Sequence, residues 1–349
     1  MAGRVVFADG WAQTVQLDRV RLGNATDASG EVHVPGQPGG PWVATLTGHS
    51  LDASAEFRHG DATATPREED LAEDQPGPPW RVQARFDQVL LGGDGRMLTG
   101  VACTAESDGR VIRQGRLTGQ TGAGAAFRAD IVPGRFSRTV TGTAEDAGGL
   151  LSAFDVLDDM RGGRLTVRAT YDDRARGHPL QGTAEIVDFR MRNAPALAKL
   201  LQAMTLYGVA EVLEGPGLGF SRMVAPFRLS RDELELADAR AFSASLGMTA
   251  KGRVDFSRHT VAVDGTIVPA YFFNTLLGEI PLIGRLFSPE RGGGVFAATY
   301  SMNGPLDDPA VSVNPLAALT PGFLRGLFGM LDGLTGSSAS SVPGGGGAN

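Results

Sequence analysis

Apolar and polar residues alternate along most of the chain. The clearest stretch runs from Trp80 to Phe86, where every second residue is apolar and the residues between are Arg or Gln. A period of two puts successive side chains on opposite faces of the backbone and is typical of a half-buried strand. Turn signals such as Gly92–Gly95 and Asp108-Gly109 punctuate these stretches. Short strands at near-regular spacing predict a meander of antiparallel strands.

Helical periodicity interrupts this alternation at a few places. The apolar spacing there predicts short helices over residues 149–161, 193–215, 270–277 and 320–334. Strands separated by short helices favour an α+β fold that is mainly β. We therefore predict an elongated, curved antiparallel β-sheet, a repeating β-groove, with a few short apolar helices.

The organisation along the chain suggests three parts. Residues 1–143 form an N-terminal β-meander groove segment, residues 144–336 a β-groove with helices, and residues 337–349 a disordered tail that contains four consecutive glycines. An acidic insert, 66–79, is bounded by prolines. We interpret it as a solvated loop, because it lacks the glycine and the alternating ligands of a calcium loop.

Composition narrows the possible functions. The 349 residues carry a net charge of −7 and no basic stripe, which argues against nucleic-acid binding. No run of about 18 apolar residues is present, so no membrane-spanning helix is predicted. The single cysteine, Cys103, is interpreted as a small apolar residue in a strand, with a reactive thiol as the alternative.

A search for catalytic and metal-binding patterns found none. The chain has no G-x-S-x-G, H-E-x-x-H or phosphate-loop motif, and its histidines lack metal-ligand spacing. His49 and Ser50 are neighbours in a predicted strand and so point to opposite faces. We predict no catalytic residue, no metal and no cofactor, and therefore a protein that is not an enzyme.

Several blocks from residue 139 onward resemble the C-terminal region of AsmA-like envelope proteins, in the branch with the YhdP- and TamB-like chains. The blocks cover roughly 190 residues, and the N-terminal half is similar only in style. The stretches that carry the resemblance are 142–151, 160–165, 189–195, 265–274, 280–284, 308–309, 313–316 and 321–325.

The resemblance implies a non-enzymatic module that conducts phospholipid between inner and outer membranes along an apolar β-groove. It further implies a periplasmic location, with a tether to the inner membrane through an upstream segment absent from this chain. Phospholipid acyl chains would be the ligand, with a membrane surface and envelope proteins as further partners. The residues expected to line the groove are Val187, Phe189, Phe227, Leu229, Leu234, Leu236, Val261 and Val263.

Three alternatives stay open at this point. The same apolar faces would also suit a closed core packed by the protein's own helices. The C-terminal helix would either cap the sheet or contact a membrane or a partner through Phe323, Leu324, Leu327, Phe328 and Leu331. The whole protein would alternatively be a structural or assembly factor for outer-membrane biogenesis that acts through protein–protein contacts.

Overall fold

A computed structural model describes the chain over residues 2–8, 11–22, 25–37, 39–55, 76–92, 95–192, 194–203, 217–269, 298–306 and 308–314. These residues form seventeen strands and two short helices. The strands are β1 (Ala2–Ala8), β2 (Trp11–Leu22), β3 (Thr26–His33), β4 (Trp42–Asp52), β5 (Trp80–Leu90), β6 (Met97–Ser107), β7 (Ile112–Thr121), β8 (Ala126–Pro133), β9 (Arg138–Ala144), β10 (Met160–Tyr171), β11 (Leu180–Met191), β12 (Leu218–Leu229), β13 (Glu233–Ser243), β14 (Leu246–Asp255), β15 (Thr260–Pro269), β16 (Ala298–Pro305) and β17 (Ala310–Asn314).

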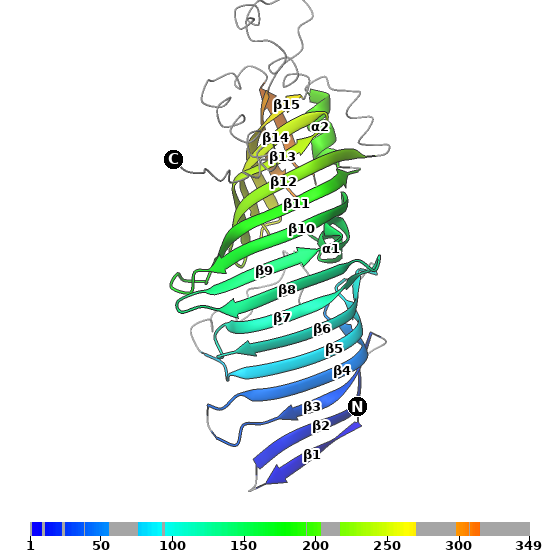
Figure 1. Cartoon of the computed structure of the whole chain (residues 1–349), viewed down its shortest axis with the longest axis vertical. Coiled ribbons are helices and arrows are strands. Elements are labelled where there is room, and N and C mark those ends of the chain that lie inside the picture. Colours follow the sequence, from blue (N-terminus) through cyan, green and yellow to red (C-terminus); the bar gives the residue numbers. More distant parts are fainter. Residues whose placement is uncertain are drawn as a thin grey trace, which may run out of the picture.

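The strands build one long, open, curved sheet, which confirms the predicted fold class (Figure 1). Each strand pairs with the next in the sequence, from β1 at one edge to β17 at the other. The sheet continues without a break through β9 and β10, on either side of residue 144.

One pair departs from the predicted antiparallel pattern. Strands β4 and β5 are parallel. A parallel neighbour requires a crossover of a dozen or more residues, and residues 53–79, which include the acidic insert, supply a connection of that length.

One face of the sheet carries an unbroken apolar line of residues from edge to edge. Directly paired residues of neighbouring strands present their side chains on the same face. Following the pairs from β1 to β17 gives an uninterrupted line of one residue per strand, which we call the central row. All its members are aliphatic, aromatic or glycine: Val5, Val15, Val32, Ala44, Val82, Ala105, Gly115, Ile131, Val140, Ala169, Gly182, Phe227, Leu236, Gly252, Val263, Met302 and Val311.

The opposite face is polar over the first eleven strands. Shifting the same path by one residue gives Arg4, Gln16, Glu31, Thr45, Gln83, Thr104, Arg116, Asp130, Thr141, Arg168 and Thr183. Alternation within each strand and in-phase pairing between strands therefore produce a two-faced sheet.

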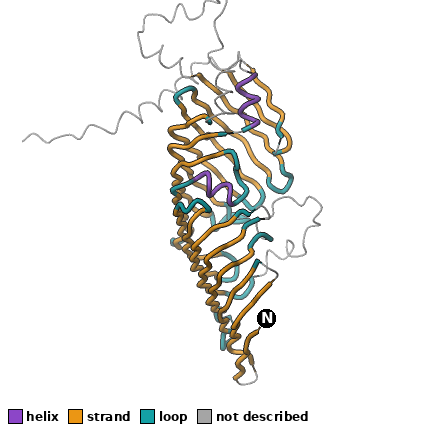
Figure 2. The backbone as a smooth tube through the Cα atoms, turned by 90° about the vertical axis from the view of Figure 1, so that its right-hand side faces the viewer, coloured by secondary structure: helices purple, strands orange, loops and turns teal. Residues whose placement is uncertain are grey.

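Both helices lie within the curve of the sheet (Figure 2). Helix α1 (Ala147–Ala153) begins at Asp146, whose carboxylate accepts a hydrogen bond from the Gly149 amide at 3.0 Å, and it packs on β10. Helix α2 (Pro195–Ala203) packs on β17, where Lys199 pairs with Asp308 at 2.5 Å. The helices share the apolar face because their leucines and alanines belong to the same buried clusters as the strands.

The predicted helices are corrected in length. The helix expected over residues 149–161 ends at Ala153, because Met160 instead pairs with Met191 as the first residue of β10. Helix α2 covers the start of the predicted 193–215 helix, and residues 204–216 lie outside the described part. The helices predicted over 270–277 and 320–334 also lie outside the described residues.

Candidate binding groove

Six of the eight residues predicted to line a groove stand in two adjacent cross-strand rows. Phe227, Leu236 and Val263 are members of the central row. Beside it runs a second line, which we call the rim row because it leads to the turns at one end of the strands. Its members are Tyr171, Leu180, Leu229, Leu234, Val254, Val261 and Gly304.

The helices cover a different row of the same face. This helix-side row consists of Phe127, Ala144, Leu165, Ile186, Met223, Ala241, Met248, Ile267 and Ala298. Every member belongs to one of the two apolar clusters that include α1 and α2, and Leu165 packs against both clusters. The protein's own helices therefore fill this side of the curve.

The central row is only partly covered over most of its length, as far as the described residues show. From Val15 to Leu236 its members are half-buried, except Ala169, which is buried. Phe227, Leu229, Leu234 and Leu236 are also half-buried, and among the described residues they belong to neither apolar cluster. Val261 and Val263, by contrast, are 6% and 5% exposed within a cluster. The result is an apolar groove bordered by a packed row, with partly solvated side chains along its floor.

Val187 departs from the expected pattern. Regular alternation places it on the face of Phe189, which is buried and stacks on Phe220. Val187 instead pairs with Arg164 on one side and Arg222 on the other, on the polar face. The physical reason is the residue between the two positions: Asp188 has φ of +57°, and this turns the backbone so that Ile186 and Phe189 share a face.

The predicted membrane or partner contacts Phe323, Leu324, Leu327, Phe328 and Leu331 lie outside the described residues.

A buried ion pair stands at the end of the rim row and was missed at the level of sequence. Arg138, 4% exposed, donates to Asp173 with Nη2–Oδ1 at 2.7 Å and to the Ile112 carbonyl oxygen at 2.8 Å. Its guanidinium carbon lies 3.9 Å from the centre of the Tyr171 ring, on the next strand. The alternation in the sequence contains a hint of this pair. Arg138 stands two residues before Val140 and four before Gly142, so it faces the apolar side of β9 with them. An arginine there needs a buried partner, and Asp173 supplies it.

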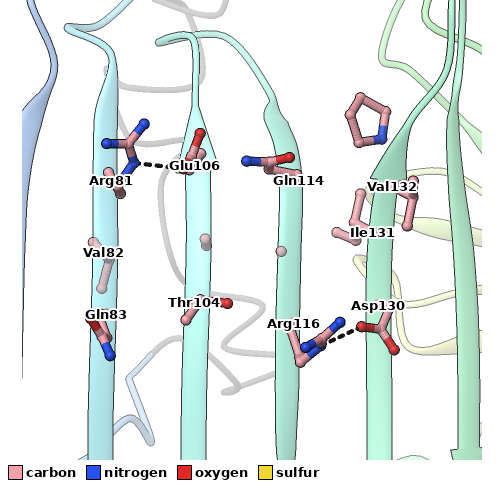
Figure 3. A pocket seen from close by; sticks show the side chains of 13 residues that line it. Arg81, Val82, Gln83, Thr104, Glu106, Gln114, Arg116, Asp130, Ile131 and Val132 are labelled. Carbon is pink, nitrogen blue, oxygen red and sulfur yellow. Dashed lines mark hydrogen bonds and ion pairs between the residues drawn. The ribbon is translucent and has the colours of Figure 1, made fainter.

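The polar face has a shallow depression of its own over β5–β8, with a volume of about 420 Å³ (Figure 3). Two ion pairs cross it: Arg81–Glu106 at 2.5 Å and Arg116–Asp130 at 2.7 Å. Hydrogen bonds from Arg128 and Arg116 lower the pKa of Asp130 to about 2. Paired charges make this depression unsuited to an apolar chain.

The described part of the chain holds no group of acidic, histidine or cysteine side chains suited to a metal ion. Nor does it contain a helix with the length and hydrophobicity needed to cross a bilayer. The arrangement thus offers a surface for burying hydrocarbon. No protein-family model, no curated protein and no solved structure matches this chain.

Proposed function

We propose that this protein is a non-enzymatic lipid-binding and lipid-transfer module of an AsmA-like envelope protein, whose groove holds phospholipid acyl chains. The observation that carries the proposal is the central row, which presents an apolar or glycine position on every one of seventeen strands. A chain lying along the row would meet no charged side chain of that row from one sheet edge to the other.

The energetics suit movement as well as binding. Removing a CH₂ group from water stabilises by about 0.8 kcal/mol, so an acyl chain of about sixteen carbons gains at most ~12 kcal/mol. This interaction is non-directional, and one position along a uniform apolar row resembles the next. A lipid would therefore slide from strand to strand with small barriers and without a catalytic group.

The proposed cellular location follows from the resemblance of the sequence to AsmA-like envelope proteins. The module would lie in the periplasm, tethered to the inner membrane, and would carry phospholipid between the inner and outer membranes. Membrane surfaces and envelope proteins would be its further partners.

A role as an assembly factor is the competing function. Strand β1 exposes Val5, Val6 and Phe7 at the sheet edge, with Phe7 66% exposed. Exposed apolar residues on an edge strand favour pairing with another protein. Such contacts would not depend on the interior of the groove.

One experiment distinguishes lipid transfer from the assembly role. The full chain is purified from a bacterial membrane fraction and its bound lipid is quantified by native mass spectrometry. Leu236→Glu puts a carboxylate on the central row, whereas Thr183→Glu puts the same charge on the polar face. Lipid transfer requires that wild type and Thr183→Glu retain lipid while Leu236→Glu loses most of it. Wild-type protein without lipid, or Leu236→Glu with a normal load, contradicts the proposal.

A further inference from the structure

A cavity of about 1010 Å³ opens at the rim of the groove, between the β10–β11 and β12–β13 turns. Its apolar lining comes from the rim row: Tyr171, Leu180 and Leu229. Leu180 and Leu229 are paired across β11 and β12, directly beside Gly182 and Phe227 of the central row. The cavity is therefore continuous with the proposed acyl-chain site.

The charged part of the remaining lining is mainly cationic. Arg110 reaches the cavity from the β6–β7 turn, Arg176 from the β10–β11 turn and Arg231 from the β12–β13 turn, against one carboxylate, Asp232. These turns lie far apart in the sequence, and the curve of the sheet brings them to one cavity. Because the sheet is concave on its apolar face, the turns that carry these arginines converge at the border of the apolar surface.

Two of these arginines have exposed side chains that form no ion pair with a described carboxylate. Other arginines in the described ranges form ion pairs, among them Arg19, Arg81 and Arg116. Arg110 and Arg176 are exposed and make no ion pair with any described residue. With respect to the described residues, their guanidinium groups are available to an anion.

Asp173, a largely buried carboxylate two residues after Tyr171, already has an arginine partner. Asp173 accepts hydrogen bonds from the Nε and Nη2 atoms of Arg138, at 2.9 and 2.7 Å. The same arginine lies over the Tyr171 ring and so fixes one wall of the cavity. Asp173 therefore balances Arg138 and leaves the positive charge of Arg110 and Arg176 for a ligand.

We propose that this cavity binds the phosphate of a lipid headgroup while the acyl chains lie on the rim and central rows. A guanidinium matches phosphate oxygens with two parallel N–H donors, and it is always charged. The inference rests on the proposed function and adds the place where the phosphate of the headgroup is bound. A free phosphate ester shares the chemistry of the headgroup, so the test has to distinguish the two sources.

The test offers the full chain an equimolar mixture of phosphatidic acid and diacylglycerol with identical acyl chains, and measures the ratio of the two complexes by native mass spectrometry. Wild type should prefer phosphatidic acid by about tenfold. Arg110→Gln/Arg176→Gln should bring the ratio near one while diacylglycerol binding persists. Arg85→Gln, an exposed arginine on the polar face of β5, should leave the ratio unchanged.

The outcomes separate this inference from the proposed function. Equal retention of both lipids by wild type, or a ratio that the double variant does not change, overturns the headgroup site and leaves the groove standing. Retention of neither lipid overturns both. Glycerol phosphate should compete for the preference only at far higher concentration than phosphatidic acid, because it lacks the chains. Arginine-dependent binding of glycerol phosphate without any lipid binding would make this an anion site unrelated to the groove and would also overturn the inference.

Discussion

The rings of Phe189 and Phe220 stack across β11 and β12, with centroids 5.1 Å apart and planes inclined by 6°. Both side chains are buried, at 3% and 4% exposed, in the cluster that includes α2. Two residues earlier on β11, Val187 faces the polar side opposite Arg222. One positive φ, at Asp188, separates a core position from a surface position.

This pair of positions gives a direct test of the fold. Phe189→Ala removes a stacked, buried ring, and we expect a loss of about 3–5 kcal/mol in the free energy of unfolding. Val187→Ala, on the same strand, should cost less than about 1 kcal/mol. Urea unfolding followed by circular dichroism measures both. Similar losses for the two variants would mean that Val187 faces the core after all.

Strands β10 and β11 approach each other closely at Gly182. A Cβ at this position would overlap the Arg168 carbonyl oxygen and the Ala169 side chain. Gly182→Ala should therefore destabilise by about 1–3 kcal/mol through forced separation of β10 and β11. Gly219→Ala is the matched control on β12, since a Cβ there has open space. It should be neutral or stabilising by up to about 1 kcal/mol, because alanine restricts the unfolded chain. The same urea titration compares them, and an equal cost at both sites would contradict the role of close approach at Gly182.

The two-faced sheet was predictable from alternation, but the lines of residues across it were not. Period two predicts that Val82 and Phe86 share a face, and they do, since both belong to cross-strand lines of the apolar side. Joining strands requires the register, and a register shift changes which residues meet. Gly100 and Asp188 have positive φ angles, and each one interrupts the regular alternation of faces that a sequence pattern assumes.

The arginine-lined cavity was out of reach for a different reason. Arg110, Arg176 and Arg231 lie in turns, where an exposed arginine is ordinary. They line one cavity only because the sheet curves and brings three turns together. Curvature comes from many small twists and close contacts distributed over the strands, and no single motif encodes it.

Acid stability should report on the ion pairs of the polar face. Arg128 and Arg116 hold the pKa of Asp130 at about 2, below its value in an unfolded chain. A lowered pKa stabilises the fold above about pH 4, and this contribution is lost as the pH falls through about 2. Asp130→Asn should therefore cost up to about 1 kcal/mol near pH 6, a modest value because solvent screens the pair, and almost nothing near pH 2. Urea titrations of both proteins at pH 6 and pH 2 test this, and a constant difference would exclude the ion pairs as its source.

Cys103, the single cysteine, is a built-in reporter of the groove. It pairs with Ala84 and Leu117 on the apolar face, next to the central row, and it is half-buried. Burial raises the pKa of its thiol, so alkylation at neutral pH should be slow and should accelerate with rising pH. A bound acyl chain should slow maleimide labelling further, by about tenfold or more, through exclusion of the reagent.

The labelling control moves the thiol to the other face. In a Cys103→Ala/Thr104→Cys variant the cysteine stands on the polar side, where Thr104 is exposed. Labelling there should be faster than at Cys103 and insensitive to lipid. If lipid slows labelling equally at both positions, it aggregates the protein and does not occupy the groove.

The N-terminal strands should belong to the same binding surface as the C-terminal ones. Val82 and Gln83 are neighbours on β5, but Val82 lies on the central row and Gln83 on the polar face. Val82→Glu introduces a charge that an acyl chain on the row would have to desolvate, so we expect lipid transfer between vesicles to fall by about tenfold or more. Gln83→Glu adds the same charge where water reaches it and should transfer lipid normally. Thermal unfolding of both variants checks that each is folded before transfer is compared. Normal transfer by a folded Val82→Glu variant would restrict the functional groove to the later strands, since a continuous path cannot bypass a charge on its floor.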